Sequence, residues 1–206
     1  MVELEILSWE DIHRLTLILA RKIIESGYRP DVIIGIMRGG WIPARILLDY
    51  LNIPTLATLE IKFYKGLGET RERPIIVHPL VVDILNKNVL IVDDVVDTGK
   101  SMSIAVEMAK LGGAHSVKTA ALVVKPWSIL EPDYYAMKSD KWIVFPWEIR
   151  ETIESMLKAK GEEVTAENIE ELSKKYSTLL KAGIDEVKLA LKLIMKNRCK
   201  KLEIRC

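Results

Sequence analysis

The feature that most constrains this chain is an alternation between short apolar runs and longer amphipathic segments. The apolar runs predict strands, and they are DVIIGIM, TLATLEIKF, PIIVHPL, NVLIVDD and SVKTAALVV. DVIIGIM and SVKTAALVV suit strands that are buried on both faces of a sheet. Helical periodicity occurs before or between these runs, at about residues 9–26, 42–51 and 101–113. Strands that alternate with helices predict an α/β fold with a doubly wound, mostly parallel sheet.

The C-terminal part of the chain has a different pattern, which begins at about residue 147. Three amphipathic segments follow one another there, WEIRETIESMLKAKG, TAENIEELSKKYS and IDEVKLALKLIMKNR, and Thr165 and Asp185 are the predicted helix caps. A short run, LEIR, is a late candidate strand. We therefore predict two domains: residues 1–150, which include the late strand KWIVFP, and a helical C-terminal extension over 151–206.

Composition excludes several classes of partner. The net charge of +1 over 206 residues gives no broad attraction to nucleic acid or to anionic membranes, and no run of 18 apolar residues predicts a membrane span. Cys199 and Cys206 lack metal-binding spacing, and the first residues lack the pattern of a signal peptide. These observations favour a cytoplasmic protein that acts on small molecules, with neither membrane nor nucleic acid as a partner.

The stretch VLIVDDVVDTGKS, residues 89–101, carries the strongest chemical signal. Its Gly-Lys-Ser ending resembles that of a P-loop, but a P-loop requires glycine at position 94, where Asp94 stands, so a nucleotide hydrolase is not predicted. The apolar strand runs into Asp93 and Asp94 and then into a turn that opens a helix. Backbone N–H groups at such a turn, together with the helix dipole, bind phosphate. The predicted phosphate loop consists of Thr98, Gly99, Lys100 and Ser101.

The two adjacent acids indicate a sugar phosphate as the ligand. Carboxylates repel phosphate, but they accept hydrogen bonds from sugar hydroxyls and bind Mg²⁺ directly or through water. A 5-phosphorylated ribose fits this layout, with its phosphate in the loop and its hydroxyls at Asp93 and Asp94. Consecutive residues of a strand face opposite sides of the sheet, so both acids reach one ligand only if the chain leaves the sheet there.

A second polar segment, Arg38-Gly39-Gly40, follows the run DVIIGIM. Ligands of open α/β sheets bind at the carboxyl ends of the strands, so this segment and residues 93–101 share one site if their strands are neighbours. A guanidinium and two residues without bulky side chains suit a pyrophosphate. An ordinary surface arginine is the alternative for Arg38.

These motifs resemble those of a known family. VLIVDDVVDTGKS is similar to the phosphoribosyl-pyrophosphate (PRPP) signature of type I phosphoribosyltransferases, and GIMRGGWIPARIL resembles their pyrophosphate loop. Lys125-Pro126 and KWIVFPWE resemble the base-binding elements of the 6-oxopurine branch, which includes bacterial xanthine-guanine enzymes and archaeal relatives. The resemblance spans about residues 8–150 and implies the type I phosphoribosyltransferase fold. It also implies a salvage enzyme that uses Mg²⁺ and PRPP, in a homodimer or a larger assembly.

The implied reaction is attack of a purine nitrogen on C1′ of PRPP, with release of pyrophosphate and formation of a nucleoside monophosphate. Hypoxanthine and guanine are the expected bases, with xanthine as a further candidate. Asp97 takes the position that contacts the purine imidazole edge as a general base. It is also a candidate N-cap of the following helix, and its two oxygens allow both roles at once. Arg38, Gly39 and Gly40 take the position of the pyrophosphate site.

The resemblance also assigns the base-binding residues. Lys125 is placed to donate to the purine O6, or else it is a solvated lysine. Trp142 is placed to stack on the base, or else it is a core residue. The carbonyls of Trp142 and Ile143 are placed to accept from the amine of guanine, and Tyr64, on a mobile loop, to cover the pyrophosphate. The alternative to an enzyme is a regulator of the same fold that senses PRPP or a nucleotide without catalysis. The helical extension favours this alternative.

Overall fold

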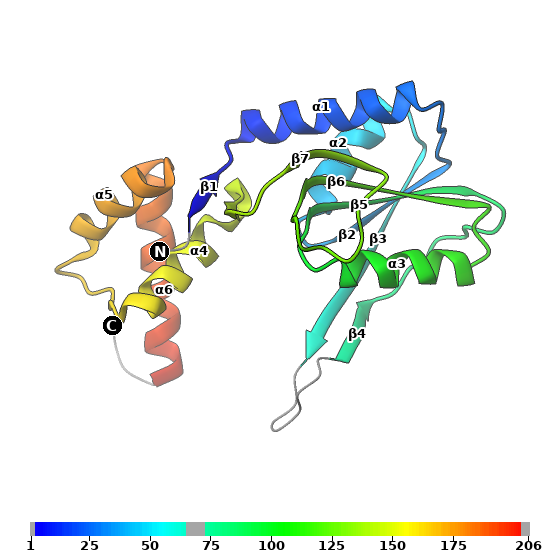
Figure 1. Cartoon of the computed structure of the whole chain (residues 1–206). Helices are drawn as coiled ribbons and strands as arrows, with labels where there is room; N and C mark the ends of the chain where they lie inside the picture. The colour runs from blue at the N-terminus through cyan, green and yellow to red at the C-terminus, as the bar shows by residue number, and fades with distance from the viewer. Residues whose placement is uncertain (1–2, 65–72, 203–206) are drawn as a thin grey trace. The chain divides into compact units, whose positions relative to one another are not determined.

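The chain packs into two compact units in a computed structural model that describes residues 3–64 and 73–202 (Figure 1). The sheet unit is Glu10–Asp140, and the helical unit combines Met1–Trp9 with Lys141–Cys206. The strand predicted at KWIVFP therefore packs with the C-terminal helices. The domain boundary at residue 150 stays a prediction.

The sheet unit is built on six strands in the order β4-β3-β2-β5-β6-β7. Their bounds are β2 Val32–Met37, β3 Thr55–Tyr64, β4 Arg73–His78, β5 Asn88–Val96, β6 Ser116–Val124 and β7 Tyr134–Lys138. Every neighbouring pair is parallel except β3 and β4, which are antiparallel, so the prediction of a mostly parallel sheet is confirmed. Strand β7 was not predicted, because this half-buried edge strand, YYAMK, lacks a continuous apolar run.

Helices cover both faces of this sheet. Helices α1 (Trp9–Glu25) and α2 (Trp41–Tyr50) lie on one face and α3 (Lys100–Leu111) on the other, as Figure 1 shows. Helix α3 packs Met102, Ala105 and Ala109 into a core shared with apolar residues of β2 and β5. The doubly wound arrangement predicted from the sequence is thereby confirmed.

The connections reverse direction between β2 and β5, which are adjacent and parallel. The chain leaves β2 through α2 to reach β3 on one side, and it leaves β5 through α3 to reach β6 on the other. The carboxyl ends of β2 and β5 therefore form the switch point at which open α/β sheets bind ligands.

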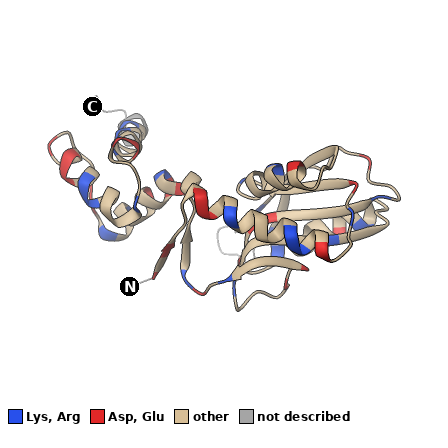
Figure 2. Ribbon diagram, turned by 90° about the horizontal axis from the view of Figure 1, so that it is seen from above, with Lys and Arg blue, Asp and Glu red and all other residues tan. Residues whose placement is uncertain are grey.

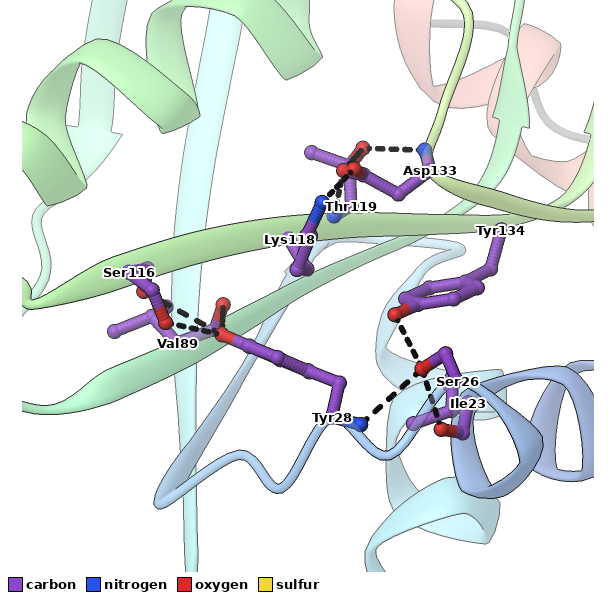
Figure 3. A network of polar contacts seen from close by, with 9 residues as sticks. All are labelled: Ile23, Ser26, Tyr28, Val89, Ser116, Lys118, Thr119, Asp133 and Tyr134. Carbon is purple, nitrogen blue, oxygen red and sulfur yellow. Dashed lines mark hydrogen bonds and ion pairs between the residues drawn. The ribbon is translucent and has the colours of Figure 1, made fainter.

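At the amino ends of the strands, a polar network links neighbouring strands (Figure 3). The Tyr28 hydroxyl donates to the Val89 carbonyl at 2.9 Å and lies 3.1 Å from Ser116 Oγ. The Asp133 carboxylate accepts from Lys118 Nζ at 2.7 Å and from the Thr119 amide at 2.9 Å. These bonds fix the amino ends of the strands whose other ends carry the predicted site.

The helical unit contains a parallel two-stranded sheet and three helices. Strand β1 (Leu4–Ile6) pairs with β8 (Trp142–Val144), and the short helix η1 (Pro146–Glu148) leads into α4 (Ile149–Lys160), α5 (Ile169–Leu180) and α6 (Ile184–Leu202). Leu4 and Ile6 pack on the core of these helices, where Tyr176 is fully buried. The three predicted helices are confirmed, whereas β1 was not predicted.

The predicted caps of α5 and α6 are wrong. Asn168 is the N-cap residue of α5, and its side-chain oxygen accepts from the Thr165 amide at 2.8 Å, one turn before the helix. Asp185 lies inside the first turn of α6, where an acidic side chain complements the helix dipole. Helix α6 extends to Leu202, and the rest of the candidate strand LEIR lies outside the described residues.

Charged residues of both signs are interspersed along the helices of both units (Figure 2), consistent with the net charge of +1. Within residues 3–64 and 73–202, none of the helices combines the length and the apolar character needed to cross a bilayer.

Candidate active site

The segment Arg38–Gly40, here called the arginine loop, contacts β5 directly at the point where the pairing of β5 with β2 ends. A Cβ atom added to Gly39 would lie 1.6 Å from Asp94 Oδ2, and one added to Gly40 would lie 2.7 Å from the Asp93 Cα. Only glycine permits so close an approach. The expectation that the two predicted segments meet is confirmed, because β2 and β5 are neighbours.

Asp93 and Asp94, here called the acid pair, are held by the main chain. Their exposed fractions are only 9% and 7%. Asp93 Oδ1 accepts from the Asp94 amide at 3.0 Å, and Asp94 Oδ1 accepts from the Val95 amide at 2.9 Å. Strand β5 stays paired with β6 as far as Val96, although its pairing with β2 ends at Val92. At the acids the chain thus leaves β2 but stays beside β6, so the sequence-based assumption holds on one side of β5 only. The two carboxyl groups nevertheless lie together, because the Asp93 side chain forms a hydrogen bond with that of Asp94.

The acid pair is electrostatically unfavourable in isolation. Burial, and then the charge of the Asp94 carboxylate, raises the pKa of Asp93 well above its ordinary value. A cation or the hydroxyls of a ligand would relieve this repulsion. Among the described residues, no group of three or more His, Cys, Asp or Glu side chains forms a metal site. A metal at the acid pair would thus take further oxygen ligands from a substrate, as Mg²⁺ commonly does.

The phosphate loop opens α3 without a side-chain cap. Gly99 is the N-cap residue, with a left-handed φ of +83°, and no side chain caps the helix. The prediction that Asp97 caps this helix is therefore wrong. The first N–H groups of a helix have no intrahelical acceptor, so this terminus suits an anion. Lys100 Nζ lies 5.9 Å from the centroid of the Phe63 ring, which places it beside β3.

Residues 125–130, here called the Trp127 turn, lie against this loop. The Lys125 amide donates to the Val96 carbonyl at 3.0 Å, and the Ile129 amide donates to the Thr98 carbonyl at 3.2 Å. A Cβ atom on Gly99 would lie 2.8 Å from Ser128 Oγ, so this close packing requires glycine. Lys125 is only 7% exposed, which excludes the alternative of a solvated lysine.

Sequence reasoning missed Trp127, which contacts both of the groups expected at the purine edges. Its Nε1–H donates to Asp97 Oδ1 at 2.8 Å, and its ring centroid lies 5.7 Å from Lys125 Nζ. Its position directly after Lys125-Pro126 is the one feature of the sequence that points to it. The sequence does not show that the turn brings Trp127 to Asp97.

The remaining predicted residues stay predictions as far as their roles are concerned. Arg38 is exposed and follows a cis peptide bond at the end of β2. Trp142 and Ile143 belong to β8 of the helical unit; Trp142 is 60% exposed, so it is not a core residue, whereas Ile143 is buried. Tyr64 ends β3 and is exposed, and residues 65–72 of the predicted mobile loop lie outside the described residues.

Comparison with known proteins gives a consistent result. The phosphoribosyl transferase domain family matches residues 4–153. A hypoxanthine-guanine phosphoribosyltransferase of Schizosaccharomyces pombe is 34% identical over 70% of this chain and 88% of its own length. The crystal structure of a purine phosphoribosyltransferase from Pyrococcus horikoshii is 45% identical, with a TM-score of 0.65 over 70% of this chain and 93% of that one. A Neisseria gonorrhoeae protein with bound ppGpp is 30% identical, with a TM-score of 0.66 over 72% and 90%.

Proposed function

The chain belongs to the phosphoribosyltransferase family, in the branch of salvage enzymes that use 6-oxopurines, and from that premise we propose how its residues carry the transfer. The proposed substrates are PRPP and hypoxanthine or guanine, with xanthine as a further candidate base. The observation that supports the proposal is the contact of Gly39 and Gly40 with the acid pair, because it joins the loop proposed for pyrophosphate to the acids proposed for the ribose.

PRPP would bind with its 5-phosphate on the N–H groups at the start of α3 and with its ribose hydroxyls at Asp93 and Asp94. The arginine loop would receive the pyrophosphate, since close backbone approach and a guanidinium both favour this anion. Tyr64, at the end of β3, would cover it.

The acid pair suits Mg²⁺ that arrives with PRPP, because two carboxylates with substrate oxygens are a typical ligand set for this ion. When bound, Mg²⁺ would neutralise negative charge on the departing pyrophosphate.

The base would meet Asp97 and Lys125. Asp97 would accept the proton at the imidazole edge as the purine nitrogen attacks C1′, a contribution of about 10²–10⁴-fold in rate for a well-placed base. The Lys125 ammonium would donate to O6 and so select against adenine, whose amino group at that position is itself a donor. The base-binding roles expected for Trp142 and Ile143, which belong to the helical unit, stay predictions from the resemblance.

A base panel tests this function. The purified chain, with PRPP and Mg²⁺, should release pyrophosphate with hypoxanthine and guanine but not with adenine. Omission of Mg²⁺, or addition of a chelator, should abolish the release. Absence of nucleotide formation with every purine would contradict the proposal.

A second candidate function is the binding of a regulatory nucleotide by the active enzyme, which differs from the alternative predicted from the sequence, a regulator without catalysis. It is favoured by the relative whose crystal structure contains ppGpp, a guanosine nucleotide with two pyrophosphate groups. Such a ligand combines a purine with phosphates, which are the groups that this site is proposed to bind. Competitive inhibition by ppGpp against PRPP would support this function, whereas unchanged rates at saturating ppGpp would exclude it.

We also propose a homodimer or larger assembly in the cytoplasm, by resemblance to the family. Light scattering at several protein concentrations tests the assembly, and a monomeric mass throughout would contradict it.

A further inference from the structure

The side chain of Trp127 makes a directional contact with Asp97. Its Nε1–H donates to Asp97 Oδ1 at 2.8 Å, a normal length for a bond to a charged acceptor. Both side chains are exposed to solvent, so burial does not force them together. Main-chain hydrogen bonds hold the two residues in place.

The Trp127 turn is fixed to the chain on both sides of Asp97. The Lys125 amide bonds to the carbonyl of Val96 at 3.0 Å, and the Ile129 amide bonds to the carbonyl of Thr98 at 3.2 Å. Val96 and Thr98 are the two neighbours of Asp97 in the sequence. The turn is closed by a bond from the Ser128 amide to the Lys125 carbonyl at 3.1 Å. The main chain thus holds the indole in register with the carboxylate.

This contact leaves a defined role for each oxygen of Asp97. An exposed aspartate otherwise rotates about its side-chain bonds, whereas a general base must present one oxygen to the proton it accepts. With Oδ1 occupied by the indole, Oδ2 is the oxygen that remains for a proton on the substrate. The same ring lies 5.7 Å from Lys125 Nζ, within the range of a cation–π contact.

We propose that Trp127 is a positioning residue for the transfer reaction: its indole N–H orients the Asp97 carboxylate toward the imidazole edge of the purine. The inference rests on the proposed function, because it assigns Trp127 an effect only through Asp97. Trp127 itself need not touch the substrate.

The Trp127→Phe variant tests the inference, because phenylalanine keeps an aromatic ring and removes only the N–H donor. With hypoxanthine, kcat should fall about tenfold, as expected when a hydrogen bond to a charged group is lost. The KM for PRPP should stay within about twofold of the wild-type value, since the phosphate sites are untouched. Ile129→Ala is the matched control: its side chain is 76% exposed on the same turn, and it should keep the wild-type kcat.

A double variant separates positioning from a merely structural role. In an Asp97→Asn background, Trp127→Phe should lower kcat by less than about twofold, because the group that it orients no longer acts as a base. Equal losses in both backgrounds would overturn the inference, as would an unchanged kcat in the single variant. A lower KM for hypoxanthine in Trp127→Phe would also overturn it, because the indole would then be competing with the base.

Failure of the inference and failure of the function give different results. If the wild type turns over hypoxanthine and Trp127→Phe matches it, only the inference fails. If the wild type uses no purine, the function fails and the catalytic inference falls with it. The contact itself is read separately by NMR: the indole N–H resonance that disappears in Trp127→Phe should shift in Asp97→Asn, and an unshifted resonance would refute the contact.

Discussion

Substitution of Gly39 by alanine should separate catalysis from folding. The added Cβ would lie 1.6 Å from Asp94 Oδ2 and 2.4 Å from Asp94 Cγ, whereas real Cβ contacts are essentially never shorter than 3.0 Å. The nearer oxygen must retreat by the difference, about 1.4 Å. A displacement of about 1 Å at a reacting centre can cost about 10²-fold in rate. We therefore expect kcat/KM for PRPP to fall about 100-fold or more.

The effect of Gly39→Ala on stability should be much smaller. The atoms that the Cβ meets belong to a side chain, which can rotate, so the cost should be that of ordinary overpacking, about 1–3 kcal/mol. For a chain of this size each kcal/mol lowers the unfolding temperature by about 2–4 °C. The variant should thus remain folded at room temperature.

The assay combines pyrophosphate release at varied PRPP with thermal unfolding followed by circular dichroism. Gly183→Ala is the control, because a Cβ at that position meets nothing within 4 Å. It should match the wild type in both measurements. A Gly39→Ala variant with wild-type kcat/KM for PRPP would refute the argument, since it would show that the Asp94 carboxylate moves without consequence.

Three further substitutions test the acid pair and the groups around the base. In Asp93→Asn, PRPP turnover should be lost, whereas the stability of the fold should rise at pH 8. The pKa of Asp93 is raised in the folded state, so the protonated carboxyl stabilises the fold in acid, and this contribution is lost as pH increases. The difference in unfolding temperature from the wild type should therefore shrink toward pH 4, and an equal difference at both pH values would contradict this reasoning. In Asp97→Asn, kcat should fall about 10²–10⁴-fold with little change in the KM for PRPP; equal turnover would remove Asp97 from catalysis. In Lys125→Gln, the preference for hypoxanthine over adenine should fall about tenfold or more in competition assays, because the amide can accept a hydrogen bond from an amino group; an unchanged ratio would exclude Lys125 from base selection.

The apolar runs of the sequence predict the central strands because those strands are buried on both faces. Runs such as NVLIVDD are stable in water only when both faces of the strand are covered. The adjacency of β2 and β5 then brings the arginine loop to the acid pair. The short or half-buried strands β1 and β7 escape prediction, because YYAMK and LEI carry neither a long apolar run nor clear alternation.

The site is less predictable than the fold, because its contacts depend on turns. The sequence alone gives Asp97 two possible roles, helix cap and general base. Only the structure excludes the role of cap, because α3 begins at Lys100. Trp127 is invisible as a partner of Asp97 until the main-chain bonds from Lys125 and Ile129 are known. The continuation of β5 through Asp93 and Asp94 is likewise a matter of pairing with β6, which composition does not encode.

The pairing of β1 with β8 has a consequence for biosynthesis. Leu4–Ile6 leaves the ribosome before the sheet unit, whereas its hydrogen-bonding partner, Trp142–Val144, emerges only after that unit has been made. The apolar side chains of Leu4 and Ile6 therefore stay unpacked in the nascent chain until the helices that cover them have been made. A change beside Leu4–Ile6 would thus act at a distance in sequence, on the helical unit.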